Sequence, residues 1–261
     1  MSADPVEAFA AEVGSNIEGL GRDAVLRERS LEWLRAITPH RYPYNFRWLG
    51  RPVIQLPQDM VAVQELVWAT RPDVIVETGI AHGGSLVLSA SILALLELAD
   101  AAARGNQLDP RRPSRKVIGI DIDIRAHNRH AIEGHPLAAW IATVEGSSID
   151  PTTVDRVRSM VPAGARVMVM LDSNHTHQHV LEELRAYAPL TSPGCWCVVF
   201  DTLVEDMPAE FCAGRPWAPG NSPKTAVHAF LREDPRFEID ASIPDKLQLT
   251  VAPDGYLRRV S

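Results

Sequence analysis

Short β-branched runs alternate with amphipathic segments along the chain between about residues 57 and 232. This alternation predicts an α/β fold with a mostly parallel sheet, because consecutive parallel strands need a crossover helix between them. The predicted strands are residues 74–78, 116–121, 140–144, 166–172 and 196–200. The predicted helices are residues 60–69, 86–103, 152–161, 177–188 and 224–232. We expect the carboxyl ends of these strands to share one edge of the sheet.

The two ends of the chain depart from this alternation. Residues 1–50 contain helical segments, for instance 24–37, and we interpret them as an N-terminal helical extension to a domain at 51–261. The extension is expected to pack on the core or on another subunit, and we expect a homo-oligomer. The tail is expected to add two or three closing strands, at residues 237–240, 247–251 and 256–260. The whole domain would then be a Rossmann-like sheet of seven strands with helices on both faces.

Residues 203–222 carry prolines, glycines and few helix signals. Long irregular segments in compact domains are commonly functional loops on the surface. We expect a mobile, lid-like loop over the carboxyl edge of the sheet.

Composition narrows the class of protein. The 261 residues are 46% hydrophobic and 23% charged, which allows a full core. The longest apolar stretch, residues 86–99, falls short of the ~18 residues that a membrane span needs. The start of the chain lacks the pattern of a signal peptide, so we expect a cytoplasmic protein. A net charge of −7 argues against nucleic-acid binding. Cys195, Cys197 and Cys212 are predicted to be buried thiols, since no second cysteine pair could close a zinc site.

A glycine-rich turn follows the strand at 74–78. Glu77 ends the strand region, and Gly79 and Gly83 would let the backbone turn tightly and approach a ligand. In an open α/β sheet this crevice binds nucleotide-like ligands. The register differs from the Gly-x-Gly-x-x-Gly pattern that cradles a pyrophosphate, which argues against a dinucleotide.

Later strand ends supply further candidates for the same crevice. Asp121 is placed where such folds hold ribose hydroxyls, and Asp123 is the second choice for that contact. Either could instead be a solvated helix cap. The turn at 145–148, with Gly146 and Ser147, could lie beside an adenine.

Two carboxylates at neighbouring strand ends predict a site for a hard divalent cation. Asp172 and Asp201 would supply oxygen ligands of the kind that Mg²⁺ prefers, and Thr202 or water could complete the shell. His175 would turn toward the same pocket and could accept a proton from a substrate hydroxyl. Replacing it with alanine should then lower turnover and leave cofactor binding nearly intact.

Other interpretations of these residues remain open at this point. Asp172 and Asp201 could merely cap helices, and His177 and His179 are expected to be solvated or packed helix residues. Alternatively, Asp172, His175 and His179 could bind zinc or non-haem iron, since the two histidines are one helical turn apart.

Laid out in this way, residues 48–260 resemble the cephalosporin hydroxylase / rhamnosyl O-methyltransferase family. The segments that carry the resemblance are 48–52, 55–59, Glu77-Thr78-Gly79 with Gly83-Gly84-Ser85, 119–121, 171–175 and Ser222-Pro223-Lys224. The resemblance implies a class I methyltransferase fold and Mg²⁺-dependent transfer of methyl from S-adenosylmethionine to hydroxyls of sugars and other natural products.

The resemblance also implies roles for individual residues. The glycine segment, with Thr78 and Ser85, would bind the cofactor, and Glu77 would meet its cationic methionine part. Asp172 and Asp201 would be metal ligands, with Asp172 also beside the cofactor, and His175 the base. Related enzymes often carry a Glu-Asp pair at the end of the fifth strand, whereas this chain has Phe200 before the aspartate.

The resulting functional hypothesis is O-methylation of a small-molecule hydroxyl acceptor, on a rhamnose-like deoxysugar or another glycosylated natural product. A metal-dependent hydroxylase is the first alternative, and it would need iron, oxygen and a reductant. A non-catalytic cofactor-binding partner in an antibiotic pathway is the second, because one potential metal ligand is absent.

Overall fold

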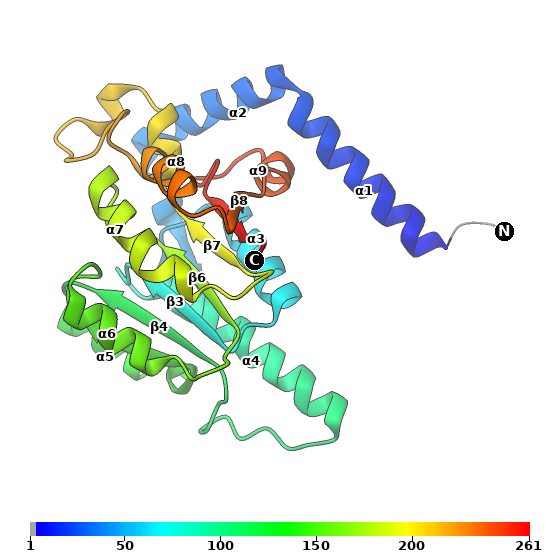
Figure 1. The fold of residues 1–261 in the computed structure, drawn as a ribbon, viewed down its shortest axis with the longest axis vertical. Helices are drawn as coiled ribbons and strands as arrows, with labels where there is room; N and C mark the ends of the chain where they lie inside the picture. Colours follow the sequence, from blue (N-terminus) through cyan, green and yellow to red (C-terminus); the bar gives the residue numbers. More distant parts are fainter. Residues whose placement is uncertain (1–3) are drawn as a thin grey trace.

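The computed structural model describes residues 4–261, and a seven-stranded sheet forms its centre (Figure 1). In spatial order the strands are β5 (Ile141–Glu145), β4 (Lys116–Asp121), β3 (Val74–Thr78), β6 (Val167–Leu171), β7 (Trp196–Val199), β9 (Tyr256–Arg259) and β8 (Phe237–Ile239). The first five are parallel, and β9 pairs antiparallel with both β7 and β8. The predicted α/β class and the mostly parallel sheet are therefore confirmed.

Helices cover both faces of the sheet, and each face has its own apolar core. Side chains alternate along a strand, so Ile75 of β3 packs on one face while Val74 and Val76 pack on the other. The first face is covered by α3 (Pro57–Thr70), α4 (Gly84–Arg104), α5 (Ala126–Glu133) and α9 (Ser242–Leu247). The second face is covered by α6 (Pro151–Met160), α7 (His177–Tyr187) and α8 (Pro223–Glu233).

Capping residues explain several helix boundaries. Asp150 caps α6 by accepting from the N–H groups of Thr152 and Thr153. Ser222 and Thr225 form a capping box at the start of α8, and Pro223 takes the first helical position, where its missing N–H costs nothing.

The predicted strand at 247–251 is wrong. Residues 242–247 form α9, and Gln248 then adopts a left-handed conformation with φ of 59° that turns the chain. Buried Asp59 of α3 holds the following residues: its carboxylate accepts from the N–H of Val251 at 3.0 Å and from the hydroxyl of Thr250. The apolar alternation in this segment therefore serves packing against α3 and adds no strand.

The aromatic stretch near residue 46 forms a small hairpin that the sequence did not predict. Its strands are β1 (Phe46–Trp48) and β2 (Arg51–Val53). They contact α4, and the indole N–H of Trp48 donates to Ser91 at 3.0 Å. The hairpin packs the backbone of Pro52 and Val53 against Gly84 at the start of α4.

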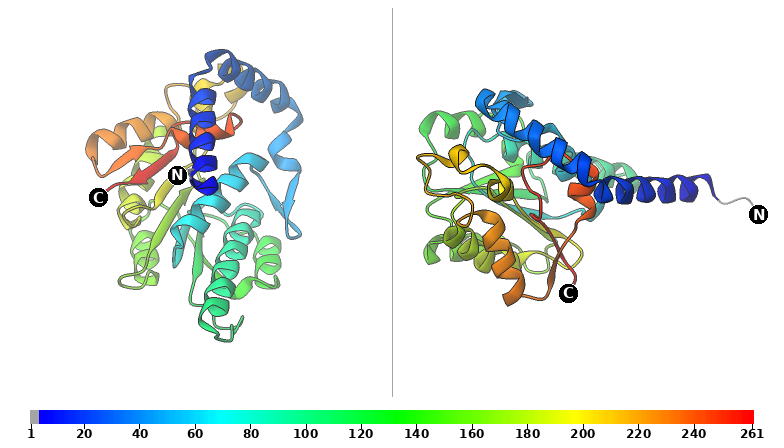
Figure 2. Two further views of the ribbon diagram at one scale, coloured as in Figure 1. Left: turned by 90° about the vertical axis from the view of Figure 1, so that its right-hand side faces the viewer. Right: turned by 90° about the horizontal axis from the view of Figure 1, so that it is seen from above.

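The N-terminal extension consists of two helices, as the helical segments in 1–50 predict, followed by the short 3₁₀ turns η1 (Thr38–His40) and η2 (Tyr42–Asn45). α2 (Ala24–Ile37) has the predicted bounds and lies over the top of the domain (Figure 1). α1 (Pro5–Arg22) projects away from the domain as an arm, which Figure 1 and the right-hand view of Figure 2 show. No residue of α1 is buried.

Helix α4 is long and apolar enough to cross a bilayer by length and composition alone. It is a core helix in this fold, because its side chains from Leu86 to Leu96 pack on the sheet and on α3. Its polar side chains also bond inside the fold: Ser89 donates to Glu77, and Glu97 accepts from Ser114 and Trp140. The predicted absence of a membrane span agrees with this packing, and the cytoplasmic location stays a prediction.

Candidate active site

A cavity of about 930 Å³ lies at the carboxyl edge of the sheet, beyond β3, β6 and β7. Its inner wall is the glycine turn after β3 together with the strand ends at Asp172 and Asp201. Its outer wall comes from the N-terminal extension, residues 34–44, and from the loop at 203–217. Part of the predicted loop at 203–222 therefore borders the cavity, where η5 (Thr202–Asp206) and η6 (Ala209–Cys212) give it local structure, and its role as a mobile lid stays a prediction.

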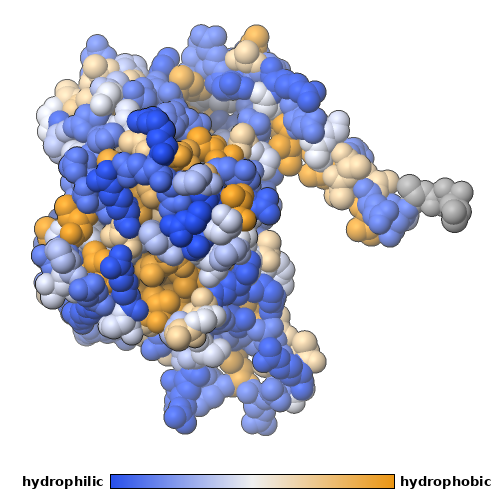
Figure 3. All heavy atoms as spheres, in the orientation of Figure 1, coloured by the Kyte–Doolittle hydropathy of each residue, from blue (hydrophilic) through white to orange (hydrophobic). Residues whose placement is uncertain are grey.

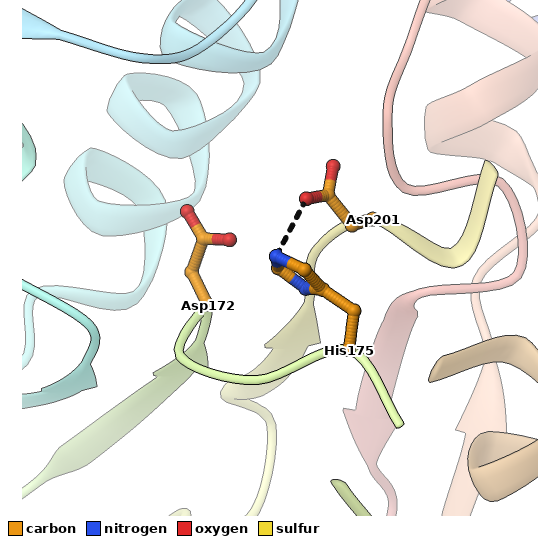
Figure 4. Close-up of side chains that lie close together, drawn as sticks. All are labelled: Asp172, His175 and Asp201. Carbon is orange, nitrogen blue, oxygen red and sulfur yellow. Dashed lines mark ion pairs between the residues drawn. The ribbon is translucent and has the colours of Figure 1, made fainter. Parts of the chain in front are cut away.

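Three predicted residues meet at the inner end of this cavity (Figure 4). Asp172, His175 and Asp201 each offer one metal-ligand atom, and these atoms lie within 4.8 Å of one another. Nε2 of His175 is 3.2 Å from Oδ2 of Asp201. The cluster joins the end of β6 to the end of β7.

Local backbone geometry aims each side chain at this point. The N–H of Asp172 donates to the carbonyl of Thr78 on β3 at 3.0 Å, which extends the parallel ladder by one residue. Asp201 adopts a left-handed conformation with φ of 55°, an unusual state for a residue with a side chain. The His175 ring packs edge-on against Trp217 of the loop, with ring centroids 4.8 Å apart.

Several carboxyl groups lie near one another at this end of the cavity. Burial raises the pKa of the Asp172 carboxyl well above its ordinary value, and the carboxylates of Asp201, Glu77 and Glu183 raise it further. A divalent cation would reverse this shift, since it favours the ionised carboxylates. The donor set, two carboxylates beside one imidazole, therefore fits a cation of the Mg²⁺ type.

Thr202, predicted as a third ligand, does not join the cluster. The residue is fully buried, and its hydroxyl donates to the carbonyl of Pro253 at 2.7 Å. Phe200 is also buried and packs in the core on the α3 and α4 face, so no ligand takes the place of the absent glutamate there.

The glycine turn is tight, as predicted, but Gly79 is required by the approach of another backbone segment, and the approach to a ligand stays a prediction. Gly79 has φ of 88°, and a Cβ atom placed on it would lie 2.0 Å from the carbonyl oxygen of Asp172. Gly79 and Ser85 line the cavity, whereas Thr78 is buried behind it and Gly83 is the left-handed cap of α4.

Glu77 lies beneath this turn and is only 2% exposed. One carboxylate oxygen accepts from the hydroxyl of Ser89 at 3.3 Å, and the other, Oε1, is buried without a partner. Desolvation raises the pKa of Glu77 to about 7, although Ser85 and Ser89 partly oppose the shift. Glu77 is not among the residues that line the cavity, and its contact with the methionine end of S-adenosylmethionine stays a prediction.

The predicted ribose and adenine residues share the correct edge of the sheet but lie outside the cavity lining. Oδ2 of Asp121 accepts from the backbone N–H of Ile80 at 2.8 Å and of Ala81 at 3.2 Å. Asp123 donates its N–H to the other oxygen of Asp121. Gly146 pairs with β4 through the carbonyl of Asp121, and Ser147 caps the turn before α6. Their roles as cofactor contacts stay predictions.

A family model described as "Rhamnosyl O-methyltransferase/CmcI" matches residues 40–260. The chain belongs to this family. It is 29% identical over 207 residues to the rhamnosyl O-methyltransferase of Mycobacterium tuberculosis, covering 77% of this chain and 73% of the relative. The rhamnosyl O-methyltransferase of Mycobacterium leprae is 26% identical over 216 residues, covering 81% and 82%. The predicted family and the predicted class of activity, O-methyl transfer, are confirmed.

Two solved structures share the fold. A CmcI chain with Mg and SAM has a TM-score of 0.53 at 19% identity and covers 84% of this chain and 78% of its own. The apo TDP-rhamnose 3'-O-methyltransferase of calicheamicin biosynthesis has a TM-score of 0.51 at 16% identity, covering 99% and 96%. The predicted class I methyltransferase fold is confirmed. Both predicted cofactors, S-adenosylmethionine and Mg²⁺, accompany the CmcI chain.

The alternative metal site in this family member is not assembled. Nε2 of His179 contacts Ser148 at 3.0 Å and Ser173 at 3.3 Å, and it lies 3.6 Å from Glu183. His177 contacts Thr225 of α8. Among residues 4–261, the group that could hold a metal ion contains His175 and Asp201 and does not contain His179. The zinc or iron hypothesis needs His179 and gives Asp201 no role.

Several residues that hold the site were missed by the sequence argument. Arg51 of β2 donates to the carbonyl of His82 at 3.0 Å, and Asn128 of α5 donates to that of Ala81 at 2.8 Å. Together they clamp the glycine turn. Trp217 was also missed, although an aromatic residue in a glycine- and proline-rich loop is the signal that could have identified it.

A glutamine in place of Glu77 is expected to change the pH dependence of stability. The raised pKa means that the contribution of Glu77 to stability is full below pH 4.5, declines as the pH rises toward 7, and stays low above 7. At pH 8 and without ligand, we expect Glu77→Gln to be more stable than wild type. Its free energy of unfolding should be higher by up to about 3 kcal/mol. Urea unfolding at pH 4.5 and pH 8 checks this, and a difference independent of pH would contradict it.

Proposed function

We propose that this protein transfers the methyl group of S-adenosylmethionine to a hydroxyl of a sugar, assisted by a divalent cation. The acceptor class is a rhamnose-like deoxysugar or another glycosylated natural product. The observation that carries the proposal is the convergence of Asp172, His175 and Asp201 in one cavity with the glycine turn. The family and the names of its curated relatives support a sugar acceptor.

Each residue of the cluster has a separate task in this reaction. Asp172 and Asp201 would hold Mg²⁺, which when bound supplies positive charge that acidifies and orients the acceptor hydroxyl. His175 accepts the hydroxyl proton. The carboxylate of Asp201, 3.2 Å from Nε2, stabilises the imidazolium that results.

Positioning supplies much of the rate, because the acceptor oxygen must attack the methyl group in line. The loop at 203–217 contributes apolar side chains over the cavity, and these would exclude water from the reacting atoms. Its apolar and aromatic lining residues are Leu203, Val204, Met207, Phe211 and Trp217. The N-terminal extension lines the same cavity through residues 34–44. We propose that these two segments select the acceptor.

One product analysis separates this proposal from the hydroxylase alternative. The protein is incubated with a methyl rhamnoside under two conditions: with S-adenosylmethionine and Mg²⁺, and with Fe²⁺, oxygen and a reductant. Mass spectrometry should show a sugar that gains a methyl group in the first condition only. A sugar that gains an oxygen atom in the second would contradict the proposal. Cofactor binding without product in either condition would favour the non-catalytic partner.

We also propose that the protein is a homo-oligomer in which α1 packs on a second copy of the chain. Val6, Phe9 and Val13 form one apolar stripe and are 76%, 66% and 37% exposed. Figure 3 shows apolar atoms along this projecting arm. The helix also contains Gly14 and Gly19, which pack against nothing. The C-terminal end of α1 packs on α9, where Asp245 lies against Gly21 and Gln248 donates to the carbonyl of Leu20, whereas the apolar stripe lies toward the exposed start of the helix.

Light scattering after size exclusion tests this arm. We expect Phe9→Glu to shift the protein toward a smaller assembly, because it places a charge in the stripe. Ser15→Glu, on the opposite side of α1, should leave the assembly unchanged. A wild-type protein that is monomeric at micromolar concentration would overturn the oligomer proposal.

A further inference from the structure

Three arginine side chains line the outer wall of the cavity. Arg35 comes from α2, Arg41 from the junction of η1 and η2, and Arg215 from the loop at 203–217. Among the described residues of this wall that line the cavity, Glu210 is the one carboxylate. The outer wall is therefore positively charged, although the whole chain has a net charge of −7.

These arginines have no carboxylate partner of their own. Among the residues that the structure describes, none of the three forms an ion pair, whereas Arg185, for example, does. Arg35 donates to the backbone carbonyl of Asp206 at 2.9 Å, and the carboxylate of Asp206 pairs with Lys224 at 2.6 Å instead. The three positive charges therefore remain available to a ligand.

Two of the guanidinium groups are held in place by aromatic rings. The guanidinium of Arg41 lies over the ring of Tyr44, 5.9 Å from its centroid, and that of Arg215 lies over Trp217 at 5.3 Å. Stacking uses the face of a guanidinium and leaves the N–H donors at its edge free. Arg41 also has a left-handed backbone with φ of 48°, a costly conformation that is common at functional sites.

Trp217 connects this wall to the reacting cluster. Its ring packs edge-on against His175, with centroids 4.8 Å apart, and Arg215 lies over the same ring. A sugar whose hydroxyl meets His175 can therefore extend along Trp217, and a charged substituent on another carbon of that sugar can reach the guanidinium of Arg215.

A phosphate group matches donors of this kind. Arginine presents a planar fork of N–H donors that fits two phosphate oxygens at once, and such charge-assisted bonds are roughly twice as strong as neutral ones. A neutral glycoside offers only hydroxyl and ether oxygens, which would leave the positive charges of the wall unmatched.

We propose that the acceptor is a sugar linked through phosphate, such as a nucleoside diphosphate sugar, and that Arg35, Arg41 and Arg215 bind its phosphate oxygens. The inference rests on the proposed function, since it names the acceptor of the same site. An activated sugar is then the acceptor in place of a finished glycoside, so methylation precedes glycosyl transfer. A glycosyl-transfer reaction consumes the methylated product.

Steady-state kinetics of the full chain with three acceptors tests the acceptor class. Methyl rhamnoside is neutral, rhamnose 1-phosphate carries one phosphate, and TDP-rhamnose carries a diphosphate and a nucleoside. With saturating S-adenosylmethionine and Mg²⁺, we expect kcat/KM for TDP-rhamnose to exceed that for methyl rhamnoside by about 100-fold or more, because several charge-assisted bonds form. A gain with rhamnose 1-phosphate as well would assign the effect to phosphate alone. Equal values for the three acceptors, or a preference for methyl rhamnoside, would overturn the proposal.

Variants of Arg215 assign the gain to the arginine wall. We expect Arg215→Gln to raise the KM of TDP-rhamnose by about 10- to 100-fold, the usual worth of a hydrogen bond to a charged group, and to leave the KM of methyl rhamnoside unchanged. Arg215→Lys keeps the charge and loses the fork, so its KM should fall between those of Arg215→Gln and wild type.

Arg47→Gln is the matched control. Arg47 is also exposed and donates to a backbone carbonyl, that of Gly50 at 3.5 Å, but it does not line the cavity. Its replacement should leave the KM of every acceptor as in wild type.

Calorimetric titration with TDP gives a readout that does not depend on turnover. The protein is first saturated with S-adenosylhomocysteine, so that TDP cannot occupy the nucleoside site of the cofactor. Mg²⁺ is omitted, because the cation itself binds a diphosphate. Wild type should bind TDP, and Arg215→Gln should bind it at least about 10-fold more weakly. Both proteins should bind S-adenosylhomocysteine with the same affinity.

Three results of these variant and binding measurements would overturn the inference. Wild type that does not bind TDP would show that the wall holds no phosphate. An equal rise in the KM of all three acceptors in Arg215→Gln would give Arg215 a structural role, and weaker binding of S-adenosylhomocysteine would assign it to the cofactor. If TDP binds but no acceptor is methylated, the proposed function fails and the phosphate site stands.

Discussion

Asp172→Asn is expected to remove divalent-cation binding and to lower the methyl-transfer rate by roughly 10³-fold, the scale of several kcal/mol that a metal ion supplies. Asparagine keeps the shape of the side chain and removes the charge. Among the described residues 4–261, the cluster holds two carboxylates, of which Asp172 is one. Phe200 is buried in the core and the hydroxyl of Thr202 bonds to Pro253, so neither adds a ligand. Calorimetric titration with Mg²⁺ and a rate measurement at saturating cofactor check both effects.

The same substitution should stabilise the protein when no metal is present. The raised pKa of Asp172 means that its ionised form is disfavoured in the folded state at neutral pH. Asp150→Asn is the control, since asparagine caps a helix as well as aspartate does and Asp150 lies at the start of α6. A variant of Asp172 that keeps its Mg²⁺ dependence and its rate would contradict the assigned metal site.

His175→Ala is expected to lower kcat by about 10²- to 10⁴-fold, which is the usual contribution of a general base. The dissociation constants for S-adenosylhomocysteine and for Mg²⁺ should stay close to those of wild type, because two carboxylates still hold the cation. Titration of both ligands, together with single-turnover kinetics, separates the roles of base and ligand.

His177→Ala provides the control for this substitution. His177 lies two residues along the chain and contacts Thr225 rather than the cluster, so its removal should change kcat by less than about tenfold. Lost Mg²⁺ affinity in His175→Ala would make His175 a metal ligand, and an unchanged rate would exclude it as the base.

The central strands were predictable because they are short, continuous apolar runs with clear ends. β3 has the predicted bounds, 74–78, since all five residues are buried and Pro72 limits the preceding helix. The failure at 247–251 has a different origin. The segment alternates like a strand, but its backbone partner is the buried carboxylate of Asp59, nearly two hundred residues earlier. Such long-range hydrogen bonds leave no local pattern.

The cluster of Asp172, His175 and Asp201 was predictable for a topological reason. Parallel strands place their carboxyl ends together, and Asp172 and Asp201 each follow such an end. Thr202 was not predictable in the same way, because the left-handed conformation of Asp201 turns the chain so that the next hydroxyl points to Pro253.

The central claim is tested most directly by transfer of a ¹³C-labelled methyl group. The protein is incubated with labelled S-adenosylmethionine and two rhamnose probes, a methyl rhamnoside and TDP-rhamnose, with Mg²⁺ or with EDTA. We predict one new methoxyl signal on a rhamnose hydroxyl in the carbon spectrum, and its loss in EDTA. No methoxyl signal on either probe, or a signal of equal rate in EDTA, would contradict a metal-assisted sugar O-methyltransferase.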